Sequence, residues 1–180
     1  SSMANLYPFH GHSPQIDPGA FVADTATIVG DVTIKKGANI WPGVVIRADE
    51  SPIVIGEGVN IQDNTVLHTD PGSPMILDDY CMIGHKAIIH GRHIGSGTLI
   101  GMGVILMGET DIGDSCLIGA GTMITQNKVI PPRSLVYGTP FRIVRSLEEE
   151  EIKNIHEDIM GYYRLGQEYK ALQDERNRGK

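Results

Sequence analysis

A six-residue period runs through most of this 180-residue chain and sets narrow limits on its fold. A large aliphatic residue recurs at every sixth position over long stretches, and a small or β-branched residue follows four positions after most of them. A period of six matches neither a 3.6-residue helix nor the two-residue alternation of a strand. It is typical of a solenoid in which three hexads of short strands and turns close one triangular coil. The aliphatic positions are Ile16, Val22, Ile28, Ile34, Ile40, Ile46, Ile55, Ile61, Leu67, Leu77, Ile83, Ile89, Ile94, Ile100, Leu106, Ile112, Ile118, Ile124 and Ile130.

The composition fits a repetitive core that is poor in aromatic residues. The chain has 22 glycines but only three phenylalanines and one tryptophan. Gly, Asp and Ser fall between the aliphatic positions and suit turns. We therefore expect the aliphatic residues to point inward and successive coils to pair as parallel strands about 4.8 Å apart. Cys81 and Cys116 occupy the small inward position, which predicts buried structural thiols rather than nucleophiles.

Charge and hydropathy exclude several classes of partner. The chain carries 15 Lys and Arg against 22 Asp and Glu, a formal net charge of −7, which argues against nucleic-acid binding. No apolar run reaches the roughly 18 residues that a membrane helix needs, so we expect no membrane partner. The N-terminus lacks the pattern of a signal peptide, and two cysteines do not make a disulfide framework. These features together predict a cytoplasmic protein.

The change of period divides the chain into three segments. Residues 1–15 form an N-terminal arm that holds His10 and His12, and residues 1–3 are read as vector-derived. Residues 16–140 form the solenoid, and residues 146–175 form a helix that begins at a capping box of Ser146 and Glu149. Gly161 and Gly166 each weaken that helix by about 1 kcal/mol, so it needs a surface to lie on. One apolar face is suited to packing on the solenoid: Ile152, Ile155, Ile159, Tyr162, Gly166 and Tyr169.

Three histidines can be placed by the hexad register. His68 and His90 are each second in a third-face hexad of consecutive coils, so we expect them to stack one strand spacing apart. Such a pair is well placed to share a metal ion. His85 lies on the second face and cannot complete their triangle within one chain, but a neighbour in a three-fold trimer could supply it. The alternative is three solvated surface histidines.

Four segments carry a resemblance to a known family. They are Ile-Arg-Ala-Asp at 46–49, Asn-Ile-Gln-Asp at 60–63, Leu-His at 67–68 and Ile-Gly-His-Lys-Ala-Ile-Ile-His-Gly at 83–91. Together they resemble the γ-class carbonic anhydrases. The resemblance implies an all-β solenoid, specifically a left-handed parallel β-helix of hexapeptide repeats with a C-terminal α-helix packed on it. It also implies zinc bound by His68, His85 and His90 across the subunit interfaces of a homotrimer, and an interface ion pair of Arg47 and Asp49.

The resemblance further implies an activity, the reversible hydration of carbon dioxide to bicarbonate by a metal-bound hydroxide. An ion held by three histidines lowers the pKa of its water to about 7, which supplies that nucleophile. The resemblance places Gln62 near the metal-bound water and Asn60 close to the site, and Tyr162 on the helix is a further catalytic candidate. Iron or cobalt could replace zinc, because both accept imidazole ligands.

One departure from the family and two other functions stay open. The loop at 69–77 lacks the glutamate with which the best-characterised branch moves protons, so hydration is expected to be slow. Glu50 and His93 are candidate relays, although each also reads as an ordinary surface residue. The repeat alone also permits a coenzyme-A-dependent acyltransferase with a histidine as general base. A catalytically inactive trimer that binds metal is the third reading.

Overall fold

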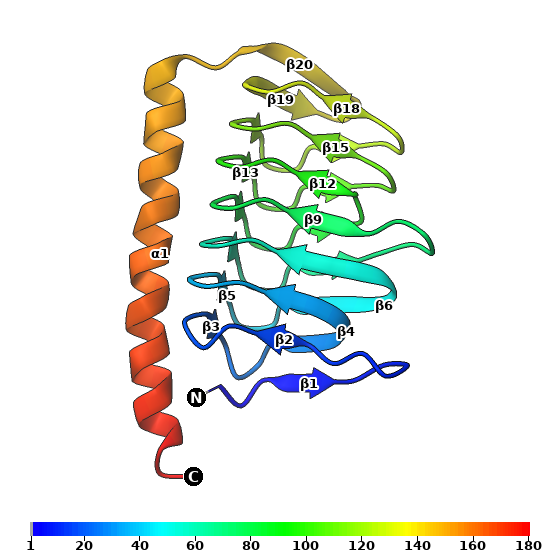
Figure 1. The fold of residues 1–180 in the computed structure, drawn as a ribbon. Helices are drawn as coiled ribbons and strands as arrows, with labels where there is room; N and C mark the ends of the chain where they lie inside the picture. Colours follow the sequence, from blue (N-terminus) through cyan, green and yellow to red (C-terminus); the bar gives the residue numbers. More distant parts are fainter. Residues whose placement is uncertain (1) are drawn as a thin grey trace.

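The computed structural model describes residues 2–180, which form a parallel β-solenoid with one long helix along its side (Figure 1). This is the predicted left-handed β-helix with a C-terminal helix. The strands are β1 (Asn5–Tyr7), β2 (Gln15–Ile16), β3 (Phe21–Val22), β4 (Thr27–Ile34), β5 (Asn39–Ile40), β6 (Val45–Ile55), β7 (Asn60–Ile61), β8 (Val66–His68), β9 (Met75–Leu77), β10 (Met82–Ile83), β11 (Ile88–Ile89), β12 (His93–Ile94), β13 (Leu99–Ile100), β14 (Ile105–Leu106), β15 (Asp111–Ile112), β16 (Leu117–Ile118), β17 (Met123–Ile124), β18 (Val129–Ile130), β19 (Ser134–Gly138) and β20 (Phe141–Ser146).

The strands line up as three faces of a prism. The first face runs through β9, β12, β15 and β18, the second through β3, β5, β7, β10, β13 and β16, and the third through β8, β11, β14 and β17. The long strands β4 and β6 cross the corner between the third and first faces and join these two faces into a single 12-stranded sheet. The second face forms a separate 8-stranded sheet.

The predicted hexad register is confirmed. Leu77 pairs with Ile55, Ile83 with Ile61 and Ile89 with Leu67, so these six positions stack as two consecutive coils. Every predicted aliphatic position from Val22 to Ile130 is 1% exposed or less. Cys81 and Cys116 are buried free thiols in the same core, as predicted. The interior is therefore a column of interlocking aliphatic side chains, and chemistry must lie on the outside or at the corners.

The end of the solenoid differs from the prediction. β19 and β20 pair antiparallel through Ser134 and Ser146, so the chain is still a strand where the helix was expected to begin. The helix α1 covers Glu149–Asn177, and its capping box is formed by Glu148 and Glu151. The capping box predicted at Ser146 and Glu149 is wrong, because strand pairing and the burial of Leu147 hold the chain extended for two more residues.

The helix returns along the second face toward the N-terminal end (Figure 1). Ile155 and Ile159 are buried against Met82, Leu135 and Leu147. Further along, Tyr162 packs against a second cluster of Phe21, Ala23 and Trp41. The predicted apolar face is therefore the face that docks on the solenoid. No helix within residues 2–180 is long and apolar enough to cross a membrane.

The predicted N-terminal arm is partly built into the solenoid. β1 pairs in parallel with β4, with Leu6 opposite Ile28 and Tyr7 opposite Val29. Ile28 is fully buried, so alternation along the strand turns Leu6 toward the end of the core and Tyr7 outward. Ser1, one of the three residues read as vector-derived, lies outside the described residues.

Candidate functional site

The predicted histidine pair stands on the third face. Ile88 and Ile89 of β11 pair with Val66 and Leu67 of β8, so His90 comes directly beside His68. Their ring centroids are 5.0 Å apart, which confirms the predicted stacking. The ring planes meet at 79° rather than lying parallel. The two imidazoles therefore form an edge-to-face pair on adjacent coils.

Carboxylates hold both rings. His68 Nε2 lies 3.0 Å from Asp49 Oδ1, and His90 Nε2 lies 2.8 Å from Asp70 Oδ1. Arg47 Nη1 donates to the other oxygen of Asp49 at 2.7 Å, so this ion pair closes within one chain. Exchange of this pair between subunits stays a prediction. Within residues 2–180, no hydrogen bond occupies the second nitrogen of either imidazole.

The pKa of Asp49 reflects two opposing effects. Burial raises it, but the hydrogen bonds from Arg47 and His68 outweigh burial and hold it below its ordinary value. Asp49 is therefore an ionised carboxylate near neutral pH. A carboxylate that accepts a hydrogen bond from a ring nitrogen fixes the orientation of the imidazole.

Asp49 and Asp70 lie in two segments that interrupt the repeat. Between Ala48 and Ile53 the chain leaves the register of β4, and a second irregular segment follows His68. Ser51 joins the two segments: its N–H donates to Thr69 Oγ1 at 3.1 Å, and its Oγ donates to the Asp70 carbonyl at 2.7 Å. Thr69 Oγ1 in turn donates to the Ser51 carbonyl at 2.8 Å. These hydrogen bonds fix the two segments in the positions that place Asp49 and Asp70 beside the histidines.

His85 stands apart from the pair, at the corner between the second and third faces. Its Nδ1 lies 3.0 Å from Asp63 Oδ1, and the side chain is 44% exposed. Within residues 2–180, no group of three His, Cys, Asp or Glu side chains is placed to hold a metal ion. One copy of the chain, as described over residues 2–180, therefore does not bring the three histidines together.

Asn60 and Gln62 belong to a buried line of amides beneath α1. Trp41 Nε1 and Asn60 Nδ2 both donate to Asn39 Oδ1, at 2.9 and 2.5 Å. Gln62 Nε2 donates to Asn60 Oδ1 at 2.8 Å. Gln62 is 5% exposed and directly precedes Asp63, the partner of His85. Asn60 therefore positions Gln62 at the same corner as His85.

Tyr162 packs on this corner from the helix. Its ring meets Trp41 edge-on at a centroid distance of 5.7 Å, and it contacts both clusters that seat α1. Burial raises the pKa of the Tyr162 hydroxyl, and the nearby charge of Asp63 raises it further. The hydroxyl therefore stays protonated near neutral pH and is a poor base. A catalytic role for Tyr162 stays a prediction.

Other candidates lie elsewhere. His93 on the first face is held between Asp78 and Asp111, each 2.7 Å from one ring nitrogen, so both nitrogens are engaged and the ring is not a free relay. His10 stacks on Phe9 in the N-terminal turn. Sequence reasoning gave no role to Asp63, Asp70 and Asn39. The register could have found Asp63, which occupies the position of His85 one coil earlier.

The candidate residues thus fall into two sets that one copy does not bring together. We call Asp49, His68, Asp70 and His90 the third-face half-site, and Asn60, Gln62, Asp63 and His85 the corner half-site. Imidazoles oriented by carboxylates are typical ligands of zinc and related divalent ions. The donor set fits such an ion, with two nitrogens from one half-site and a third from the other.

Comparison with known proteins agrees with the repeat and with the motifs. The hexapeptide family models "Bacterial transferase hexapeptide (six repeats)" and "Hexapeptide repeat of succinyl-transferase" match residues 93–126 and 74–107. A carbonic anhydrase of Geobacillus kaustophilus is 44% identical over 95% of this chain and 94% of its own length. A probable carbonic anhydrase of Methanocaldococcus jannaschii is 48% identical over 81% of this chain and 92% of its own.

Solved structures give the same architecture under another name. A putative acetyltransferase from Bacillus cereus superposes with a TM-score of 0.90 at 40% identity, covering 96% of this chain and all of that one. The hexapeptide fold is thus shared by proteins named for different chemistries, so the fold alone does not assign an activity. On those motifs and on its full-length relatives, this chain belongs to the γ-class carbonic anhydrase-like family of hexapeptide-repeat proteins.

Proposed function

We propose that this protein is a metal-dependent carbonic anhydrase that works as a homotrimer, with its sites between subunits. One observation carries the proposal. The chain builds a carboxylate-oriented histidine pair on one face and a carboxylate-oriented third histidine at a different, outward corner. Two half-sites that face outward in this way are completed by joining copies of the chain. A closed three-fold ring completes every site with identical contacts.

His68 and His90 from one copy and His85 from the next would hold the ion, with zinc as the expected metal. When bound, such an ion makes a water acidic near neutral pH, which is the chemistry that hydration of carbon dioxide requires. Asp63 keeps Nδ1 of His85 engaged and so leaves Nε2 as the ligand. Asp49 and Asp70 engage Nε2 of the other two rings, which leaves Nδ1 of His68 and His90 as the ligand nitrogens.

Gln62 is the residue suited to orient the small substrate. Its amide is uncharged, nearly buried and fixed by Asn60, so it can donate to or accept from an oxygen without being displaced by water. Asn60 is fully buried and acts through Gln62, so it is a positioning residue. Tyr162 closes the corner behind these amides. We therefore expect Gln62→Ala to lower kcat more than metal content.

Metal content and turnover test this proposal together. We expect about one divalent ion per subunit and carbon dioxide hydration that chelation abolishes. His85→Ala and His68→Ala should each lose both metal and turnover while keeping the fold. His156→Ala is the matched control, because His156 is exposed on α1 away from both half-sites.

A mixing experiment shows where the ligands come from. His85→Ala and His68→Ala chains, unfolded together and refolded, can form mixed trimers with one intact interface, so both metal and hydration should return. A site within one chain would recover nothing on mixing, which would contradict the proposal. Bound metal without carbon dioxide hydration would contradict the enzyme and support the catalytically inactive trimer that binds metal. Acetyl transfer from acetyl-coenzyme A by a metal-free wild type would favour the acyltransferase reading.

A further inference from the structure

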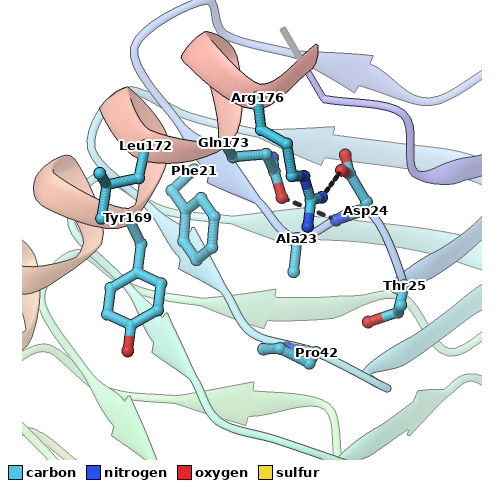
Figure 2. Close-up of a pocket in the computed structure, with 9 residues that line it drawn as sticks. All are labelled: Phe21, Ala23, Asp24, Thr25, Pro42, Tyr169, Leu172, Gln173 and Arg176. Carbon is cyan, nitrogen blue, oxygen red and sulfur yellow. Dashed lines mark hydrogen bonds and ion pairs between the residues drawn. The ribbon is translucent and has the colours of Figure 1, made fainter. Parts of the chain in front are cut away.

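A groove two coils below the candidate site has no role in the proposed function. It is a cavity of about 410 Å³ between the last turns of α1 and the first coils of the solenoid (Figure 2). Figure 2 shows the rings of Phe21 and Tyr169 and the side chain of Leu172 around it. Leu172 is 63% exposed although it is a large aliphatic residue. We call this feature the tail groove; its apolar lining is Phe21, Ala23, Pro42, Tyr169 and Leu172.

Charged groups border the tail groove. Arg176 of α1 pairs with Asp24 at the corner of the first coil. The Asp24 N–H donates to Gln173 Oε1 at 3.0 Å, and this bond and the Arg176 pair are drawn in Figure 2. The groove is thus an apolar hollow with hydrogen-bonding groups at its rim. An amphipathic aromatic side chain suits a hollow of this kind.

The strand register links the tail groove to the corner half-site. Val22, Ile40, Ile61 and Ile83 pair in succession along the second face. The residues two positions after them therefore form one outward column along the corner. From the first coil to the fourth, that column is Asp24, Pro42, Asp63 and His85.

A second column runs along the third face. Tyr7 pairs with Val29, Val29 with Arg47 and Arg47 with His68, and His90 follows one coil later. Asp24 precedes Val29 by five residues, as His85 precedes His90. Asp24 therefore has the same height relative to Tyr7 and Val29 as His85 has relative to His68 and His90.

This equivalence predicts a contact between copies. If His85 of a second copy meets His68 and His90 while the two solenoids run side by side, Asp24 of that copy meets Tyr7, three coils or roughly 14 Å lower. The same alignment brings Asp63 of the second copy to the level of Arg47 and His68. Arg47 and Asp63 are both partly exposed and carry opposite charges. The alignment therefore pairs complementary groups at more than one level.

We propose that Tyr7 of one copy docks in the tail groove of its neighbour, so that the N-terminal strand clamps the same interface that holds the metal. Tyr7 is 53% exposed and points outward from β1. In the groove its ring would pack against the apolar lining, and its hydroxyl would hydrogen-bond to Asp24 or Arg176 at the rim. The inference rests on the proposed trimer and adds to it an interface that needs no metal.

The subunit affinity of Tyr7 variants tests the proposal. Tyr7→Ala should weaken assembly about tenfold for each of the three contacts in the metal-free protein, measured by sedimentation equilibrium. Tyr7→Phe should keep most of the affinity, because the ring supplies the apolar burial. Tyr137→Ala is the matched control, since Tyr137 is similarly exposed, at 48%, but lies at the opposite end of the solenoid. Equal affinity for Tyr7→Ala and wild type would overturn the clamp.

Cross-linking gives an independent readout. Chains with Tyr7→Cys and differently tagged chains with Leu172→Cys are mixed, assembled and treated with a short bismaleimide. A cross-link between the two chain types is expected, and none for Tyr137→Cys with Leu172→Cys. The native Cys81 and Cys116 are buried and stay silent. A metal-loaded trimer without the cross-link overturns this proposal alone, whereas a monomeric, metal-free wild type overturns the proposed function as well.

Discussion

Two glycines in α1 allow a sharp test of how the helix is seated. Gly161 has open space where a Cβ would lie, with no atom within 4 Å. A Cβ on Gly166 would lie 2.7 Å from Asn39 Cβ and 3.2 Å from Asn39 Cγ. Both substitutions to Ala gain about 1 kcal/mol of helix propensity. Helix propensity is therefore the same at the two positions, but the space available for a methyl group differs.

The packing difference sets the magnitude. Gly161→Ala should raise the free energy of unfolding by about 0.5–1 kcal/mol. At Gly166 the extra methyl overpacks against a buried side chain, which costs about 1–3 kcal/mol and exceeds the propensity gain. Gly166→Ala should therefore lower the free energy of unfolding by up to about 2 kcal/mol. Asn39 accepts hydrogen bonds from Trp41 and Asn60, and Asn60 accepts one from Gln62. Gly166→Ala should therefore also disturb the position of the Gln62 side chain.

Urea unfolding measures both variants, at one protein concentration because the proposed subunit association would add to stability. Trp41 is the single tryptophan, and it contacts Tyr162 and Tyr169, so its fluorescence reports directly on helix docking. Opposite shifts of the unfolding midpoint for the two variants are expected. Equal stabilisation by both would refute the close contact between Gly166 and Asn39 and the seating of α1 argued from it.

Three further predictions concern titration and reactivity. Burial lowers the pKa of His93, but its hydrogen bonds to Asp78 and Asp111 outweigh burial and raise the pKa above 6.5. The charged ring therefore stabilises the fold fully below pH 6.5, and this stabilisation is lost as the pH rises through the pKa of the folded state. The Tm of the wild type should accordingly exceed that of His93→Gln by less as the pH rises. The hydrogen bond from Arg145 lowers the pKa of Glu151 to about 2. The ionised carboxylate therefore stabilises the fold above pH 4.5, and this stabilisation is lost as the pH falls toward 2. Glu151→Gln should not show this loss of stability in acid unfolding. Burial raises the pKa of the Cys81 thiol, so a thiol reagent should label it only after unfolding, and rapid native labelling would contradict the buried core.

What the sequence could predict follows from how rigidly the solenoid translates sequence into position. Each coil repeats at a fixed spacing, so the place of Ile61 in its hexad was enough to bury it, and the places of His68 and His90 were enough to set them side by side. The same logic separates His85 from them. Contacts of the interruptions escaped prediction, because side-chain bonds of Ser51 and Thr69, not the period, decide where Asp49 and Asp70 lie.

The helix start was missed for a related reason. Ser146 with Glu149 matches the Ser/Thr-x-x-Glu capping box and Glu148 with Glu151 does not, so the local sequence favours the earlier start. The choice is made by β19, whose pairing with β20 keeps Ser146 extended. Nonlocal strand pairing thus overrides the helix start that the local motif favours.

The division of the site between two surfaces is itself a consequence of the fold. In a triangular prism, outward side chains of neighbouring faces diverge, so a single chain can stack ligands along one face but cannot wrap them around an ion. His68 and His90 use the stacking that the prism offers. In the proposed trimer a third ligand comes from a second prism, and Asp63 holds the ring of His85 at the corner that would supply it. Metal binding and assembly should therefore be linked, so that added zinc strengthens subunit association and Asp63→Ala weakens the effect of zinc without abolishing the trimer.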